Sequence, residues 1–181
     1  LVATIEDWNA TQGVNYFLLE LPGDVVAAVV RRTRDVPALL FNLTAPENEL
    51  RGRACQRNLI HTSASYAMQM DALMQYLLSK QWRDLLILGG PRPADQLIVE
   101  SMERSAKRFG GKIIDTRPFV LSNDPRERGK NNIALMTAGR DHDVIFVADS
   151  DGEFGRYVPY QTNRARPVVG TVGLVPVAWT W

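Results

Sequence analysis

Two uninterrupted apolar runs of strand length constrain the fold of this chain most strongly. They read "DLLILGG" at residues 84–90 and "DVIFVADS" at residues 143–150. Runs without alternating polar residues are typical of parallel strands that are covered on both faces. Further strands are expected at residues 15–21, 38–42, 58–62, 112–121 and 167–175. Because helical patterns separate these strands, the sequence predicts an α/β fold with a mostly parallel sheet.

The clearest helical pattern follows Ser65, a good N-cap residue. After it, apolar side chains recur with the spacing of one helix face, at Met70, Leu73, Met74, Leu77 and Leu78. Three other helices are expected: one at 24–34 capped by Asp24, one that ends at Gly110-Gly111, and one that opens at Asp124-Pro125.

Both ends of the chain are unusual for an α/β domain. The first predicted strand has almost nothing before it, and the chain stops at "VPVAWTW" without a closing helix. The first residues include Glu6 and Asp7 and no basic segment, which is not the pattern of a signal peptide. We therefore expect a fragment, or the ordered part, of a longer protein.

The charge distribution argues against two classes of partner. The 181 residues include 21 basic and 20 acidic ones, for a net charge of +1. The basic residues are scattered, which disfavours nucleic-acid binding, and no apolar run reaches the roughly 18 residues of a membrane-spanning helix. The single cysteine, Cys55, allows no internal disulfide and no cysteine-based metal site.

The strand end "VIFVADSDGEF" is similar to the first motif of haloacid-dehalogenase-type phosphatases. In that resemblance Asp149 would be the nucleophile and Asp151 the acid, around a magnesium ion. However, that motif normally opens its domain, and no lysine follows Glu153 in this chain. A magnesium-dependent phosphatase is therefore the weaker alternative, and solvated acids at a strand end are the simpler interpretation.

Histidine chemistry receives little support from the sequence. His61 has serines nearby, so a Ser-His-Asp triad stays open, but no G-x-S-x-G motif is present. His142 lies between two aspartates and is expected at the surface. The two histidines have no metal-ligand spacing, so no metal site and no cofactor are expected.

Ligands of open parallel sheets collect beyond the carboxyl ends of the strands. This rule selects residues 42–47, 89–95, 149–153 and 170–173. At the first place, Asn42 and Thr44 offer an uncharged amide and hydroxyl that suit a small polar ligand. An Asx-turn or ST-turn that ends the strand explains the same residues equally well.

Several tracts together resemble one family, and the resemblance runs from about residue 13 to residue 181. The tracts are "LRGRAC", "NLIHTSAS", "DALMQYLLSKQW", "AKRFGGKI", "RPFVLSNDPRERGKNNIALMT", "DVIFVADSDGEFGRYVPYQT" and "RPVVGTVGLVPVAW". They resemble type I periplasmic binding proteins of the leucine/isoleucine/valine class. Within that class, they are most similar to the ABC-transporter substrate-binding proteins found with the PQQ-dependent alcohol dehydrogenase system.

The resemblance implies Rossmann-like lobes with a ligand in the cleft, here truncated at both ends. Residues 1–62 would be the end of lobe one and the crossover, and residues 63–181 would be most of lobe two. The positions that match the family's ligand contacts are Asn42, Thr44, Ala94, Asp149, Ser150 and Thr171. The aromatic residue and the carboxylate that hold amino-acid ligands in the family have no direct match here.

The function that the resemblance implies is solute binding without catalysis or cofactor. The protein would be exported to the periplasm and would pass a small polar ligand to an ABC permease. A degenerate binding-protein-like module for sensing or interaction is the alternative from another class.

Overall fold

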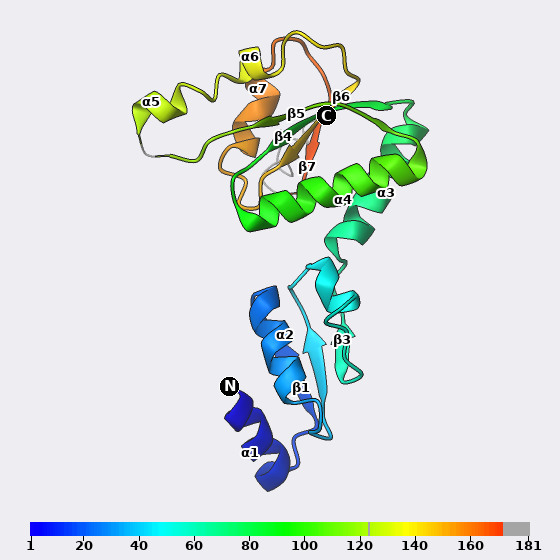
Figure 1. The fold of residues 1–181 in the computed structure, drawn as a ribbon, viewed down its shortest axis with the longest axis vertical. Helices are drawn as coiled ribbons and strands as arrows, with labels where there is room; N and C mark the ends of the chain where they lie inside the picture. Colours follow the sequence, from blue (N-terminus) through cyan, green and yellow to red (C-terminus); the bar gives the residue numbers. More distant parts are fainter. Residues whose placement is uncertain (123, 172–181) are drawn as a thin grey trace. The chain divides into compact units, whose positions relative to one another are not determined.

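The computed structural model describes residues 1–122 and 124–171, and it divides the chain into two compact units. The first unit is Leu1–Gln69 and the second is Met70–Trp181. Figure 1 shows the elements of each unit. The predicted boundary, between residues 62 and 63, precedes helix α3 (Tyr66–Ser79), whereas the structural boundary falls inside that helix.

The first unit is built on a three-stranded parallel sheet in the order β1-β2-β3. Its elements are α1 (Val2–Gln12), β1 (Tyr16–Leu19), α2 (Gly23–Arg32), β2 (Leu39–Asn42), the 3-10 turn η1 (Asn48–Arg51) and β3 (Leu59–His61). All three predicted strands are confirmed, each within a few residues of its expected limits.

Helix α2 covers one face of this sheet because its valines form an apolar stripe. Val26, Val29 and Val30 are buried in one cluster with strand residues such as Leu40. The helix begins one residue earlier than predicted. Its N-cap is Pro22, which makes no side-chain cap, and Asp24 lies inside the first turn.

Alternate side chains of β1 remain exposed on the sheet. Tyr16 and Leu18 are 68% and 70% exposed, and Ile60 on β3 is also exposed. The Tyr16 and Phe41 rings lie 6.4 Å apart. Parallel strands are usually covered on both faces. The exposed face that carries Tyr16, Leu18 and Ile60 is therefore unusually apolar.

The second unit contains a four-stranded parallel sheet in the order β5-β4-β6-β7. Its elements after α3 are β4 (Asp84–Gly89), α4 (Pro93–Phe109), β5 (Lys112–Pro118), α5 (Pro125–Arg128), α6 (Ile133–Met136), β6 (Val144–Ala148), η2 (Gly155–Tyr157), α7 (Val158–Gln161) and β7 (Val168–Gly170). The two central strands, β4 and β6, come from the two apolar runs, and both are almost entirely buried. The sequence therefore predicted the centre of this sheet correctly.

Helices α3 and α4 meet through polar and apolar contacts. Asp71 accepts hydrogen bonds from Ser105 and from Arg108, both at 2.8 Å. A Cβ atom at Gly111 would lie 2.6 Å from the Met74 methyl group, so a larger residue there would have to displace the end of the Met74 side chain. Gly110 adopts the left-handed conformation (φ 87°) that ends α4, as predicted.

The other predicted helix ends are also confirmed. The Ser65 hydroxyl accepts the backbone N–H of Met68 at 3.3 Å, and the Asp124 carboxylate accepts that of Arg126 at 2.9 Å. The expectation of almost nothing before β1 was wrong, because α1 occupies that segment. Only Ile5 of α1 is buried, so the helix has no apolar stripe that a periodicity search would detect. Residues 172–175 of the last predicted strand lie outside the described residues.

Candidate functional site

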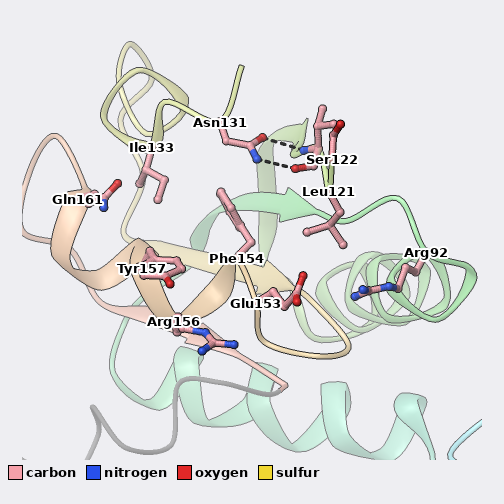
Figure 2. Close-up of a pocket in the computed structure, with 11 residues that line it drawn as sticks. Arg92, Leu121, Ser122, Asn131, Ile133, Glu153, Phe154, Arg156, Tyr157 and Gln161 are labelled. Atoms are coloured by element: carbon pink, nitrogen blue, oxygen red, sulfur yellow. Dashed lines mark hydrogen bonds between the residues drawn. The ribbon is translucent and has the colours of Figure 1, made fainter. Parts of the chain in front are cut away.

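A cavity of about 880 Å³ opens at the carboxyl edge of the second unit's sheet (Figure 2). Its walls come from the loops that follow three neighbouring strands, β4, β5 and β6. Eleven described residues line it: Arg92, Val120, Leu121, Ser122, Asn131, Ile133, Glu153, Phe154, Arg156, Tyr157 and Gln161. Its size falls within the range of about 300–1,000 Å³ that small-molecule pockets occupy.

The floor of the cavity is apolar and closely packed. Phe154 stacks on Phe119 with ring centroids 4.1 Å apart and an interplanar angle of 14°. Ile133 is buried in the same cluster, and Figure 2 shows Phe154, Ile133 and Leu121 around the centre of the cavity. This surface suits the apolar part of a small solute.

The rim of the cavity is polar and carries charges of both signs. Arg92 forms an ion pair with Asp151. Arg156 donates from Nε to the Gly152 carbonyl at 3.1 Å, and its guanidinium lies over the Tyr157 ring, 5.9 Å from the centroid. Glu153 is exposed. The rim can therefore hydrogen-bond a polar group on a solute whose body rests on the floor.

The Asp149 carboxylate, fully buried at the end of β6, fixes the loop that carries half of this rim. Its Oδ2 atom accepts the backbone N–H groups of Phe154 and Gly155, both at 2.8 Å. Its Oδ1 atom is buried and has no hydrogen-bond partner among the described residues. In this arrangement the carboxylate organises the loop and has no exposed surface.

A second buried carboxylate, Asp95, holds the turn between β4 and α4. Its Oδ2 atom accepts the backbone N–H of Arg92 at 3.0 Å, and its Oδ1 atom accepts that of Ser150 at 2.7 Å. A Cβ atom at Gly90 would lie 2.2 Å from Asp95 Oδ2 and 2.7 Å from the Phe119 ring. Glycine directly after β4 thus leaves room for both the carboxylate and the Phe119 ring that stacks on Phe154.

The four residues predicted in the second unit lie near this edge but do not line the cavity. Ala94 is a half-buried residue in the first turn of α4. Thr171 donates from its hydroxyl to the Asp149 carbonyl at 3.4 Å, and Ser150 follows Asp149 directly. Asp149, Ser150 and Thr171 therefore cluster at the carboxyl end of β6, and solute contact by any of the four stays a prediction.

At the carboxyl edge of the first unit's sheet, the Asn42 side chain is fully engaged within the protein. Its amide donates to the Ala45 carbonyl at 2.7 Å and contacts His61 Nδ1 at 3.1 Å. Its oxygen accepts the Ala45 backbone N–H at 2.9 Å. This geometry is the Asx-type turn that the sequence left open, and ligand contact by Asn42 stays a prediction. Thr44, in the same turn, is exposed.

The environment of His61 fixes its tautomer. Because the Asn42 amide is a donor, His61 Nδ1 is the acceptor, and the ring carries its proton on Nε2. Burial, reinforced by the positive charge of Arg51, lowers the pKa of His61 from its ordinary value. A ring nitrogen that already accepts a hydrogen bond from an amide is poorly placed to serve as the base of a triad.

The two aspartates of the phosphatase alternative do not form an accessible pair. Asp149 is inaccessible, and Asp151 is paired with Arg92. No group of three or more His, Cys, Asp or Glu side chains is arranged to hold a metal ion within residues 1–122 and 124–171. The arrangement at this edge is chemically suited to binding a solute.

The sequence profile of a family described as periplasmic binding protein matches residues 2–127. No curated protein matches the chain. A solved branched-chain amino acid ABC transporter periplasmic ligand-binding protein from Burkholderia xenovorans LB400 has a TM-score of 0.75 and 14% identity, over 94% of this chain and 46% of that one.

Two other solved structures show a similar likeness. The branched-chain amino acid transporter substrate-binding protein of Streptococcus pneumoniae, in complex with isoleucine, has a TM-score of 0.65 and 17% identity, over 96% of this chain and 48% of that one. A solute-binding protein of an ABC transporter from R. palustris, in complex with benzoate, has a TM-score of 0.65 and 14% identity, over 99% and 50%. The chain thus spans about half the length of these proteins.

Proposed function

The chain belongs to the periplasmic binding protein family, and from that premise we propose that it is the substrate-binding component of an ABC transporter. It holds a small polar solute between two lobes and catalyses no reaction. The α/β fold with parallel sheets, predicted from the sequence, is confirmed as that of type I periplasmic binding proteins.

The observation that carries the proposal is the cavity at the carboxyl edge of the second unit's sheet. It combines an apolar floor at Phe154 and Ile133 with a charged rim at Arg92, Glu153 and Arg156. Such a combination suits a solute with a small apolar body and one or more polar groups. Related proteins of known structure carry isoleucine or benzoate in their complexes, and both molecules have that character.

We assign the first unit to lobe one and the second to lobe two. Thr44 and Asn42 would face the solute from lobe one, and Ala94, Asp149, Ser150 and Thr171 would lie on the lobe-two side. The contacts of Asp149 favour a supporting role, in which it holds the loop that carries Phe154. Lobe closure over the solute would supply the signal that a transporter reads.

The partners and location follow from the same proposal. The protein would act in the periplasm and deliver its solute to an ABC permease. Among the described residues, no helix has the length and apolar character needed to cross a membrane. A connection with PQQ-dependent alcohol oxidation rests on the sequence tracts quoted above and directs the choice of test solutes.

The proposal is tested by a thermal-shift screen of the full-length protein with amino acids, short-chain alcohols, aldehydes, organic acids and PQQ. A solute present at about 100 times its Kd raises the free energy of unfolding by about 2.7 kcal/mol. We expect a shift that Arg156→Met weakens and that Arg126→Met, an exposed arginine outside the cavity, leaves unchanged. No shift across the panel would favour the degenerate, non-binding module. Magnesium-dependent hydrolysis of phosphate esters, lost in Asp149→Asn, would favour the phosphatase.

A further inference from the structure

A second pocket opens at the opposite edge of the second unit's sheet, where β6 and β7 begin. It has a volume of about 270 Å³. It is lined by residues 137–142, which follow α6, and by Asn163, Arg164 and Arg166, which come after α7 (Figure 1). Strand β6 therefore runs from this pocket to the loop that borders the solute cavity, and no described residue lines both sites.

Positive charge is concentrated in this second pocket. Its lining has three guanidinium groups, those of Arg140, Arg164 and Arg166, and a single carboxylate, that of Asp141. The lining therefore has a net formal charge of +2, whereas the whole chain has a net charge of only +1. A concave surface with an excess of one sign of charge attracts ions of the opposite sign. The pocket is thus electrostatically suited to an anion.

The three guanidinium groups are accessible to a ligand. The Arg140 side chain is 63% exposed and lies 3.8 Å from the carboxylate of Asp115. The Arg166 side chain is 31% exposed and contacts Asp141, which is itself 88% exposed, at 2.8 Å. Arg164 is exposed and forms no ion pair with the described residues. Because exposed ion pairs are weak in water, an anion in the pocket can compete for these groups.

The two loops that form the pocket are fixed by buried hydrogen bonds. The Asn163 backbone N–H donates to the Thr137 hydroxyl at 3.0 Å, and that hydroxyl donates to the Ile133 carbonyl at 2.8 Å. His142 Nδ1 donates to the Arg140 carbonyl at 2.8 Å. The expectation that His142 lies at the surface was wrong, because this residue is only 6% exposed. The backbone that carries the arginines is therefore held in place before a ligand arrives, which reduces the entropy cost of binding.

We propose that the second pocket binds a phosphate group, either as inorganic phosphate or as the phosphate of a small monoester. The planar N–H fork of a guanidinium group matches two oxygens of a phosphate. At neutral pH a phosphate group carries a charge of about −1.5 to −2, which balances the lining. The volume is just below the range of about 300–1,000 Å³ for larger ligands, as a compact anion requires. This inference goes beyond the proposed function, because the solute cavity lies at the other edge of the sheet.

The test is isothermal titration of the full-length protein with inorganic phosphate, glycerol 3-phosphate and succinate. Sodium chloride keeps the ionic strength constant, because salt screens exposed charges. We expect a Kd of about 1 mM or below for at least one of the two phosphate compounds, and their relative affinities identify the free ion or the ester as the ligand. Succinate has two separate carboxylates in place of one compact group, so it should bind at least about fivefold more weakly.

Two substitutions in the lining should change the affinity for phosphate in opposite directions. Arg164→Met removes one guanidinium group and should raise the Kd at least about fivefold. Asp141→Asn removes the carboxylate that competes for Arg166 and should lower the Kd at least about threefold. A protein that is merely destabilised would not bind more tightly, so the second variant separates a charge effect from a folding defect. Arg126→Met, an exposed arginine outside the pocket, is the matched control and should leave the Kd unchanged.

Three outcomes would overturn the inference. They are the absence of phosphate binding at about 1 mM, succinate binding as tight as that of phosphate, and phosphate binding that Arg164→Met and Asp141→Asn leave unchanged. If Arg156→Met alone weakened phosphate binding, the anion would lie in the solute cavity and the inference would also fail. The proposed function is judged separately, by the thermal-shift panel, and Arg164→Met should leave any shift with a solute of that panel unchanged.

Discussion

The Asp95 carboxylate accepts the backbone N–H of Ser150 at 2.7 Å, which joins two loops that lie 55 residues apart in sequence. The same carboxylate accepts the backbone N–H of Arg92. One buried side chain therefore ties the start of α4 to the end of β6. The relative position of the loops on either side of the cavity depends on it.

Asp95→Ala should lower the free energy of unfolding by about 2–4 kcal/mol, because two backbone N–H groups lose their acceptor in a buried place. Asp95→Asn retains one acceptor oxygen and should lose about half as much. Urea unfolding monitored by circular dichroism measures both variants. The control is Glu103→Ala on the exposed face of α4, which should change stability by no more than about 0.5 kcal/mol. Equal losses of stability for Asp95→Ala and Glu103→Ala would show that the hydrogen bonds of Asp95 do not stabilise the protein.

Asp149→Ala should loosen the loop that carries the rim of the cavity. The backbone amides of Phe154 and Gly155 would lose their common acceptor, so we expect their hydrogen exchange to accelerate by at least about tenfold, which corresponds to about 1.4 kcal/mol of local stability. Amides at the centre of β4 serve as the internal reference, since their exchange should change only with global stability. Uniform acceleration across the unit would contradict a local role.

Substitutions at Phe119 and at Tyr157 should distinguish an effect on the stability of the protein from an effect on solute binding. Phe119→Ala removes one ring of the buried stack and should cost about 3–5 kcal/mol. Tyr157 lines the cavity and is 53% exposed. Tyr157→Ala should therefore preserve stability within about 0.5 kcal/mol while weakening the binding of any solute found in the screen. A large stability loss in Tyr157→Ala would contradict this division.

His61 should make the stability of the first unit depend on pH. Burial and the charge of Arg51 lower its pKa in the folded state. Its contribution is complete above the unfolded pKa of about 6.5 and is lost as the pH falls through the folded value, because the unfolded chain then binds more protons.

The pH dependence is measured as the midpoint of urea unfolding between about pH 5 and pH 7.5, a range that brackets the ordinary pKa of histidine. Wild type should lose stability below about pH 6.5, and His61→Gln should show a flatter profile in the same range. Parallel profiles for the two proteins would contradict the assignment of this dependence to His61.

The strands of this fold could be predicted because buried strands have uninterrupted or alternating apolar residues in their sequence. Strands β4 and β6 are examples, and both were placed to within a few residues. Helix α1 was missed because only Ile5 of its eleven residues is buried. The short elements α6, η2 and α7 were missed because four residues or fewer carry no periodicity.

The candidate site was only partly predictable. The rule for strand ends selected 89–95 and 149–153, which include the cavity residues Arg92 and Glu153. It gave no sign of Asn131, whose amide holds the backbone of Val120 at 2.6–2.8 Å. Such a residue lies in a loop far from any strand end in sequence, and only the folded chain brings it to the cavity.

The crowding of Gly90 against Asp95 has a consequence for how relatives of this protein diverge. A side chain at position 90 would collide with the carboxylate at position 95 and with the ring of Phe119. Substitution of Gly90 by alanine or serine should therefore be accompanied by a substitution at position 95 or at position 119. Drift at the three positions should be concerted, and an alignment of close relatives would record it as covariation.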